Sequence, residues 1–283
     1  MSTRKLIDVV IASAVRTPVG CFRGSLSKLT ASELGAVAIR GAIDKAAIDS
    51  SHVKEVYMGN VLQANQGQAP ATQALIKAGL SESTPATTIN KVCASGMKAV
   101  MLAAQNIQVG AQPAMIAGGM ESMSNVPYYA PRGKEYGHSE LSDGIIKDGL
   151  WDPYNNFHMG NCAENTARKH SITREMQDAH AIESYKQVVP VAIKGRKGEQ
   201  IVSIDEEFTN VKFDKIASLR PVFEKTGTVT AANSSTLNDG ASALLLMAAD
   251  RASELGVKPL ARIVSYADAA TLPIDFPIAP SLA

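Results

Sequence analysis

One cysteine stands where the sequence changes from a strand pattern to a helix pattern. Residues 87–92 (TTINKV) are typical of a β-strand, and beyond Cys93 apolar residues recur at helical spacing from Met97 to Ile107. Cys93 is therefore expected on a strand-to-helix turn, at or just before the helix N-terminus. The unpaired N–H groups and the positive dipole end at such a position favour thiolate over thiol and stabilise an oxyanion. This arrangement offers the chemistry of a cysteine nucleophile.

A structural role for the same cysteine has to be weighed beside the chemical one. The small residues Ala94, Ser95 and Gly96 leave room for a substrate next to Cys93. The alternative is a buried cysteine that packs as a small hydrophobic residue, which is the commoner role of a single free cysteine. The local sequence leaves both interpretations open.

Two further segments have side chains suited to ligand binding. His158 lies in a turn beside Met159 and Gly160, and it is the one histidine of five that we place near a site. The others have no chemical partner at a recognisable spacing: His52, His138, His170 and His180. Residues 229–235 (VTAANSS) are small and rich in hydroxyl groups, so their backbone amides are suited to binding a polar, chain-like ligand.

The glycine pair Gly118-Gly119 follows a short strand predicted over residues 114–117. A nucleotide-binding interpretation is disfavoured, because no G-x-G-x-x-G run is present and no phosphate-binding helix opens there. We interpret the pair as a tight packing turn.

The composition is typical of an intracellular α/β protein without a strong overall charge. Hydrophobic residues make up 45% of the chain, and 28 Lys and Arg face 27 Asp and Glu, so no overall field attracts nucleic acid or an anionic membrane. The three cysteines form no C-x-x-C pair, which disfavours a zinc site or a disulfide scaffold and favours a reducing compartment. No apolar run approaches transmembrane length, and the five residues before the first expected strand are too few for a signal peptide. We expect a cytoplasmic protein, with the mitochondrial matrix as the alternative.

Strand and helix patterns alternate along the chain. Strands are expected at residues 7–14, 53–62, 87–92, 114–117, 241–248 and from 260, and helices at 30–47, 71–78 and after Cys93. This alternation predicts an α/β fold with a mixed, mostly parallel sheet covered by helices. Residues 122–152, rich in Pro, Tyr and Gly, form a long excursion with a short helix at 144–149; excursions of this length are usually functional or contact another subunit.

Four motifs in this order make the chain resemble the thiolase family, in its biosynthetic branch. They are NKVCASG at 90–96, GGMESMS at 118–124, HMG at 158–160 and NSSTLNDG at 233–240. The resemblance extends over essentially the whole chain. It implies a thiolase-like layered fold with an N-terminal thiolase domain (residues 1–120 and 239–259). It also implies an inserted α+β loop domain (121–238) and the start of a C-terminal thiolase domain (260–283).

The resemblance implies a reversible Claisen condensation of two acetyl-CoA molecules to acetoacetyl-CoA and CoA. It makes Cys93 the catalytic nucleophile that carries the acetyl group. The residues that it implies for binding coenzyme A or acetyl-CoA are His158, Met159, Asn210, Lys212, Lys215, Arg220, Ala231, Ala232 and Ser235. Some relatives bind a monovalent cation such as K+, and the matching positions here are Tyr185, Ala231, Ala232 and Ser234. The resemblance implies no other metal, no tightly bound cofactor, and a homo-oligomer, either a dimer or a tetramer.

Motifs that supply the acid–base chemistry of the family do not occur in these 283 residues. In the family, a histidine in Gly-His-Pro activates the nucleophile, and a second cysteine in Cys-x-Gly-Gly-Gly transfers the proton. No histidine follows His180. We therefore expect most of the C-terminal thiolase half to be missing, apolar surface to be exposed, and the isolated chain to be inactive, because general acid–base catalysis contributes about 10²–10⁴-fold. The chain also reads as shortened near Lys186, compared with the family pattern.

Two other functions are set against the thiolase interpretation. The first is a non-catalytic chain that binds CoA or a full-length thiolase partner. The second is a cysteine hydrolase, which is disfavoured because no His–Asn or His–Asp pair accompanies Cys93 in a suitable context.

Overall fold

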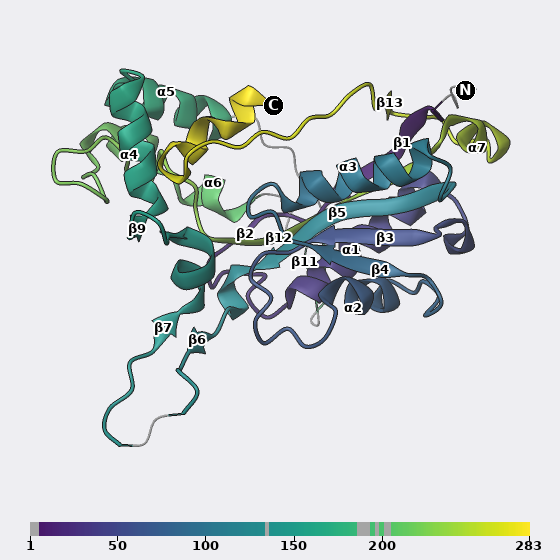
Figure 1. Cartoon of the computed structure of the whole chain (residues 1–283), viewed down its shortest axis with the longest axis horizontal. Coiled ribbons are helices and arrows are strands. Elements are labelled where there is room, and N and C mark those ends of the chain that lie inside the picture. The colour runs from purple at the N-terminus through teal and green to yellow at the C-terminus, as the bar shows by residue number, and fades with distance from the viewer. Residues whose placement is uncertain (1–5, 134–135, 186–192, 196–197, 201–204) are drawn as a thin grey trace. The chain divides into compact units, whose positions relative to one another are not determined.

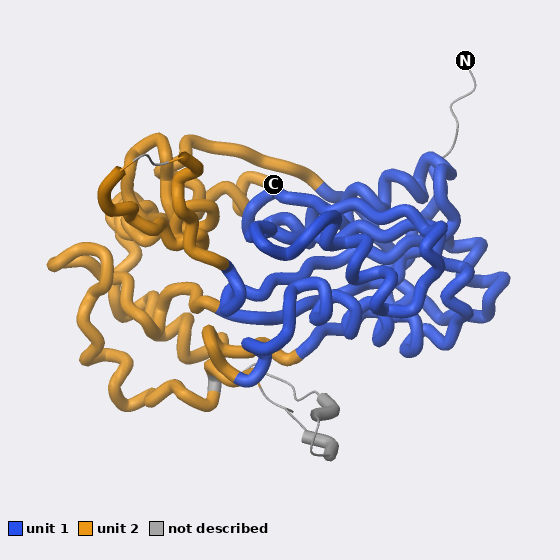
Figure 2. The backbone as a smooth tube through the Cα atoms, turned by 90° about the horizontal axis from the view of Figure 1, so that it is seen from below, with its two compact units in different colours: residues 1–17, 25–126, 238–266 blue, residues 18–24, 127–237, 267–283 orange. Residues whose placement is uncertain are grey.

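The structure is a computed structural model that describes residues 6–133, 136–185, 193–195, 198–200 and 205–283. The chain divides into two compact units, coloured separately in Figure 2. Unit 1 comprises residues 1–17, 25–126 and 238–266, and unit 2 comprises residues 18–24, 127–237 and 267–283. The chain therefore passes from unit 1 into unit 2 three times. The assignment of thiolase domains to the ranges given above stays a prediction.

Unit 1 is built on a mixed sheet in which the strands follow one another in the order β13-β1-β12-β5-β3-β4 (Figure 1). Their bounds are β1 Val9–Arg16, β3 Glu55–Gly59, β4 Ala86–Ile89, β5 Ala114–Ser122, β12 Asn238–Ala248 and β13 Ala261–Arg262. Strand β3 runs parallel to β4 and β5, whereas β12 runs antiparallel to both β5 and β1. Strands β1, β3, β4 and β5 therefore point the same way, and the predicted α/β class with a mixed, mostly parallel sheet is confirmed.

Helices cover both faces of this sheet. They are α1 (Ala31–Ala46), α2 (Pro70–Lys77) and α3 (Ser95–Gln108), and α7 (Ala249–Glu254) follows β12. Adjacent residues of β5 show the two faces, because a Cβ at Gly119 would contact Gly96 of α3, whereas the side chain of Met120 meets Gly35 of α1. Figure 1 shows α3 along β5, with α1 and α2 on the other side of the sheet.

The first helix begins with a capping box, which the pattern Thr30-Ala-Ser-Glu33 predicts. The Thr30 side chain accepts a hydrogen bond from the backbone N–H of Glu33, and the Glu33 carboxylate accepts one from the backbone N–H of Thr30 at 2.8 Å. One cluster of the apolar core lies between the sheet and α3, where Val9, Ala103, Ile107, Met115 and Leu246 are buried together.

The interpretation of Gly118-Gly119 as a packing turn is wrong. Strand β5 continues through both glycines to Ser122, in register with β12 from Asp239 to Met247. A Cβ at Gly118 would overlap the carbonyl oxygen of Ser242 on β12. The pair therefore allows β5 and β12 to approach closely within the sheet. The sequence alone does not show that β12 lies beside these glycines, so a turn was the simpler interpretation.

Unit 2 consists of helices and short strand pairs. The bounds are β2 Gly20–Cys21, β6 Tyr128–Tyr129, β7 Ser142–Asp143, β8 Trp151–Asp152, β9 Phe157–His158, α4 Met159–Lys169, α5 Arg174–Tyr185, β10 Ile193–Gly195, β11 Gly198–Gln200 and α6 Glu206–Asn210. The remaining helical turns are Ile146–Leu150, Phe213–Ser218 and Pro273–Leu282 in unit 2, and Ser50–His52 and Met123–Asn125 in unit 1. The short helix predicted at 144–149 is confirmed, because residues 144–145 are helical and lead directly into the π-helical turn Ile146–Leu150. The expected shortening near Lys186 lies outside the described residues.

Several large apolar side chains of unit 1 are exposed, and the expected exposure of a surface for a C-terminal half stays a prediction. Met97 and Val109 of α3 are 66% and 55% exposed, and Val264, which follows β13, is 78% exposed. Among the residues that the structure describes, no helix has both the length and the apolar character needed to cross a membrane.

The end of β3 and the start of α3 approach each other most closely at Gly59. A Cβ at Gly59 would lie 2.5 Å from the Gly96 nitrogen and 2.5 Å from the Ser95 carbonyl carbon, closer than real Cβ contacts. The missing side chain therefore allows the N-terminus of α3, two residues after Cys93, to rest against the sheet.

We expect Gly59→Ala to lower the free energy of unfolding by about 1–3 kcal/mol, because the added methyl group meets backbone atoms that can only move with the helix. The matched control is Gly41→Ala inside α1, where a Cβ would lie 3.5 Å from the Val15 Cγ2 atom, an ordinary contact. Gly41→Ala should stabilise by about 0.5–1 kcal/mol through helix propensity. Urea unfolding measures both, and equal stabilisation by the two variants would contradict the close approach.

Candidate active site

Cys93 lies between β4 and α3, on the strand-to-helix turn that the sequence predicts. Its side chain is exposed, so the alternative of a buried, packed cysteine is wrong. The N-cap of α3 is Ala94, which offers no side-chain acceptor to the first N–H groups of the helix. The positive end of the α3 dipole therefore lies next to the thiol without a competing capping side chain.

The backbone of the turn around Cys93 is strained, and the side chains of Asn90 and Ser95 hold it in place by hydrogen bonds. Val92 has a φ of 49°, in the left-handed region, which costs a β-branched residue about 1–3 kcal/mol. The Ser95 hydroxyl accepts a hydrogen bond from the Lys91 N–H at 2.8 Å and donates one to the Val92 carbonyl at 2.5 Å. The Asn90 side-chain oxygen accepts from the Val92 N–H at 3.0 Å.

A half-buried carboxylate orders the loop that follows β3. Glu121 of β5 accepts hydrogen bonds from the backbone N–H groups of Val61 and Leu62 at 2.9 and 3.2 Å, and from the Asn60 amide at 2.7 Å. Burial raises the pKa of Glu121, and these three hydrogen bonds act in the opposite direction. The loop is thereby fixed beside Gly59, which adjoins the start of α3.

In unit 2, His158 ends β9 and caps α4. Its Nδ1 atom accepts a hydrogen bond from the Gly160 N–H at 3.0 Å, and its ring stacks on Phe223 with 4.8 Å between centroids. Because Nδ1 is an acceptor, the neutral imidazole carries its proton on Nε2. Burial lowers the pKa of His158, which favours this neutral form.

A hollow of about 260 Å³ lies within unit 2, here called the unit 2 pocket. It is lined by Glu207, Asn210, Val211, Lys212, Lys215, Ile216, Leu219, Ala231 and Ala232. Five of the residues implied for CoA binding are thus brought together: Asn210, Lys212, Lys215, Ala231 and Ala232. Four others do not line it: His158, Met159, Arg220 and Ser235. The roles of all nine stay predictions.

Two lysines, Lys212 and Lys215, make one side of the unit 2 pocket suitable for binding an anion. Lys212 and Lys215 are exposed, so their ammonium groups can approach a phosphate without being desolvated. The Glu207 carboxylate also lines the pocket, but it accepts a hydrogen bond from the Cys21 thiol at 3.0 Å. Burial, followed by this contact with Glu207, raises the pKa of Cys21 to about 12, so Cys21 is held as a thiol.

The loop before Ala231 is fixed by a buried carboxylate. Glu164 of α4 is 1% exposed and accepts hydrogen bonds from the backbone N–H groups of Thr228 and Val229 at 2.9 and 2.8 Å. No local pattern in the sequence predicts the hydrogen bonds of Glu164 and Glu121 or the left-handed backbone of Val92. Tyr185, a candidate cation ligand, lies at the end of α5, but its side chain is outside the described residues.

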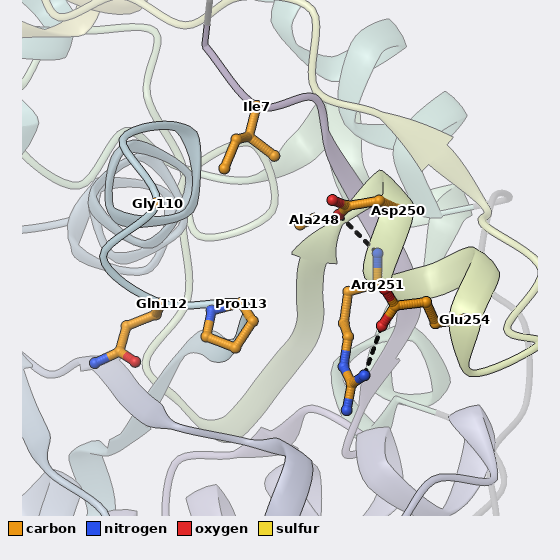
Figure 3. A pocket seen from close by; sticks show the side chains of 8 residues that line it. All are labelled: Ile7, Gly110, Gln112, Pro113, Ala248, Asp250, Arg251 and Glu254. Atoms are coloured by element: carbon orange, nitrogen blue, oxygen red, sulfur yellow. Dashed lines mark hydrogen bonds and ion pairs between the residues drawn. The ribbon is translucent and has the colours of Figure 1, made fainter. Parts of the chain in front are cut away.

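A second hollow, of about 380 Å³, lies in unit 1 (Figure 3). It borders Pro113, just before β5 begins, whereas Cys93 follows the end of β4, which points the same way as β5. The hollow therefore lies at the end of the sheet where the parallel strands begin, and Cys93 lies at the end where they finish. Its Arg251 pairs with Glu254 at 2.7 Å. Across the described residues, no group of three or more His, Cys, Asp or Glu side chains could hold a metal ion.

A sequence profile, curated sequences and solved structures all show similarity of this chain to thiolases and acetyl-CoA acetyltransferases. The sequence profile described as "Thiolase, N-terminal domain" matches residues 9–250. The mitochondrial acetyl-CoA acetyltransferase of Danio rerio is 61% identical over 100% of this chain and 71% of its own length. The Homo sapiens protein of the same name is 58% identical over 99% of this chain and 69% of its own length. The crystal structure of Acat5 thiolase from Ascaris suum in complex with coenzyme A matches with a TM-score of 0.90 and 43% identity, over 98% of this chain and 75% of that one.

We expect iodoacetamide to label Cys93 before Cys21 and Cys162 near pH 8, because thiolate character and exposure control the reaction. Cys93 is exposed and Cys162 is buried, while the raised pKa of about 12 keeps Cys21 protonated. Peptide mass spectrometry after timed labelling gives the order.

The control for this labelling experiment is Glu207→Gln. It removes the carboxylate that helps to raise the pKa of Cys21, so Cys21 should be labelled faster while the rate at Cys93 stays unchanged. Labelling of Cys21 ahead of Cys93 in the unmodified chain would show that the exposure or the raised pKa is wrong.

Variants of His158 separate its capping role from its titration. His158→Ala should cost about 1 kcal/mol, as expected for loss of an N-cap, whereas His158→Asn keeps an acceptor for the Gly160 N–H. The lowered pKa means that the folded protein binds this proton less readily than the unfolded chain. Protonation therefore favours unfolding as the pH falls below about 6.5.

The acid-dependent decline in the free energy of unfolding should consequently be shallower in His158→Asn than in the unmodified protein. Urea unfolding at a series of pH values measures this slope. If the two slopes coincide, His158 is not held in its neutral form by burial.

Proposed function

Because this chain belongs to the thiolase family, a family of enzymes, we propose that it acts as an acetyl-CoA acetyltransferase with Cys93 as its nucleophile. Relatives named acetyl-CoA acetyltransferase, 58% and 61% identical, support this choice of reaction. The observation that carries the proposal is Cys93 itself, exposed on a strained turn at the N-terminal end of α3.

In the first half of the proposed reaction, the Cys93 thiolate attacks the carbonyl carbon of acetyl-CoA. The C–S bond to CoA then breaks, CoA leaves as a thiolate that takes up a proton, and the acetyl group remains on Cys93 as a thioester. The positive end of the α3 dipole is suited to stabilise the oxyanion that forms during this step.

In the second half, a base removes a methyl proton from another acetyl-CoA, and the resulting enolate carbon attacks the acetyl thioester. The bond to Cys93 breaks, which gives acetoacetyl-CoA and regenerates the thiolate. The 283 residues contain neither the Gly-His-Pro nor the Cys-x-Gly-Gly-Gly run of the family. We therefore assign the acyl transfer step to these residues and expect no condensation from them alone.

The unit 2 pocket is the proposed site for part of CoA. Lys212 and Lys215 supply positive charge for phosphate groups, and the turn at Ala231 and Ala232 offers backbone groups to the pantetheine chain. The CoA complex of the Ascaris suum thiolase supports an acyl-CoA ligand. Binding of a monovalent cation by Tyr185, Ala231, Ala232 and Ser234, and assembly into a dimer or tetramer, remain predictions from the family resemblance.

The vertebrate relatives are named as mitochondrial, which supports the matrix rather than the cytoplasm for this chain. The second candidate function is a non-catalytic chain that binds CoA or a full-length thiolase. The unit 2 pocket supports it, because Lys212 and Lys215 line this pocket beside the turn at Ala231 and Ala232.

Incubation with acetyl-CoA followed by peptide mass spectrometry should place one acetyl group on Cys93 and release one equivalent of CoA. Cys93→Ser should lose the adduct, and Cys21→Ser should retain it. Acetoacetyl-CoA should stay undetected.

The two candidate functions give different results in this experiment. If no acetyl group is found on Cys93 while CoA still protects residues 127–237 from proteolysis, the binding function replaces the enzymatic one. Absence of both effects would refute both functions.

A further inference from the structure

The two walls of the unit 2 pocket come from segments that are separate in the sequence. One wall contains Lys212, Lys215, Ile216 and Leu219, and the other is the turn at residues 231–232. The width of the pocket therefore depends on whatever connects these two segments. Helix α5 supplies that connection through its first turns.

Arg174, the first residue of α5, holds the first wall. Its Nη2 donates to the Ile216 carbonyl at 2.7 Å, and its Nη1 donates to the Leu219 carbonyl at 3.0 Å. Its Nε donates to the Asp178 carboxylate, one helical turn along, at 2.8 Å. The three nitrogens of the guanidinium group thus bind the first wall and Asp178 of α5 at the same time. A lysine ammonium cannot make this planar set of hydrogen bonds.

Asp178 continues the connection to the second wall through Asn233. Its other carboxylate oxygen accepts a hydrogen bond from the Asn233 amide at 2.9 Å. The same amide donates to the Thr228 carbonyl at 3.1 Å, and the Asn233 side-chain oxygen accepts from the Thr230 N–H at 2.7 Å. Asn233, directly after the turn at 231–232, therefore fixes the chain immediately before that turn.

The burial of this connection sets it apart from a surface ion pair. The side chains of Arg174 and Asp178 are 19% and 11% exposed, whereas the Arg168 side chain of the Arg168–Glu224 pair is 59% exposed. Neither Arg174 nor Asp178 lines the pocket. Loss of one partner of a buried, hydrogen-bonded pair leaves the other charge uncompensated, so the whole connection responds to a single substitution.

We infer that Arg174, Asp178 and Asn233 are positioning residues that set the distance between the two walls of the unit 2 pocket, and thereby its affinity for the nucleotide and pantetheine parts of CoA. The identity of the ligand rests on the proposed function, whereas the mechanical connection does not. The positive charge of Arg174 acts on the protein and not on the phosphates of CoA.

Arg174→Lys separates the two roles, because it keeps the charge and removes the planar arrangement of donors. We expect calorimetric titration with CoA to show roughly 10- to 100-fold weaker binding, the range expected when hydrogen bonds to a charged group are lost. Arg168→Lys, the control in the exposed pair of α4, should leave the affinity unchanged. Unchanged affinity in Arg174→Lys would overturn the inference in favour of a direct charge effect.

A double-mutant cycle tests whether Arg174 and Asn233 act through one connection. Asn233→Ala should weaken CoA binding, and the double variant with Arg174→Lys should be little weaker than the worse single variant. The rate of Cys93 alkylation by iodoacetamide should stay unchanged throughout, since the connection is confined to unit 2. Fully additive losses would show that the two residues act independently.

Amide hydrogen exchange tests the connection without CoA. In Arg174→Lys, exchange should speed up roughly 10-fold at both walls, at the Leu219 N–H and at the Thr230 N–H, because the two are opened by one event. Acceleration at Leu219 alone would overturn the inference. If the unmodified protein does not bind CoA but both walls still respond together, the proposed ligand is wrong and the connection stands.

Discussion

The position of the nucleophile depends on a contact between glycines. A Cβ at Gly59 would lie 2.5 Å from the Gly96 nitrogen, and one at Gly119 would lie 3.3 Å from the Gly96 Cα atom. These three residues let the backbone of α3 lie directly on β3 and β5. Glycine is entropically costly in regular elements, so its presence at these three points indicates a requirement for close approach. The same contact brings the Cys93 turn to the carboxyl ends of the parallel strands, where α/β proteins commonly place their sites.

The glycines fix the position of a helix, and carboxylates on strands and helices fix the positions of loops. Glu121, Glu164 and Asp178 each come from a strand or helix and bind amide groups of another segment. Each carboxyl group is surrounded by several hydrogen-bond donors, which offset the cost of burying its oxygens. Backbone that has no regular partner is thereby fixed to a rigid element, and the ligand-binding loops gain order without an extension of the sheet.

Local patterns in the sequence predicted the features that depend on local structure. The capping box at Thr30, the turn at Cys93 and the alternation of strands and helices were all readable, because neighbouring residues determine them. The continuation of β5 through Gly118 was not, because its cause is the carbonyl of Ser242 on a strand far along the chain. The connection from Arg174 to Asn233 was also missed, because Asn233 lies 55 residues beyond Asp178 and no local pattern joins them. The left-handed backbone at Val92 opposes the preference of its own side chain, and no sequence pattern predicts it.

The order of strands in unit 1 has a consequence for how the chain reaches this structure. Strand β12 lies between β1 and β5, and its register joins Ala248 to Val9 and Asp239 to Ser122. During synthesis, β1 and β5 therefore emerge long before the strand that joins them, and all of residues 127–237 are made in between. Contacts so distant in sequence close large loops and slow folding, and until they form, the apolar edges of both strands are open to wrong pairing. The backbone hydrogen bonds within α4 and α5 join residues about four apart, so these helices can form earlier than the sheet. The nascent chain is thus expected to carry an ordered insertion inside an incomplete sheet, a state in which a chaperone that shields strand edges would have the greatest effect on yield.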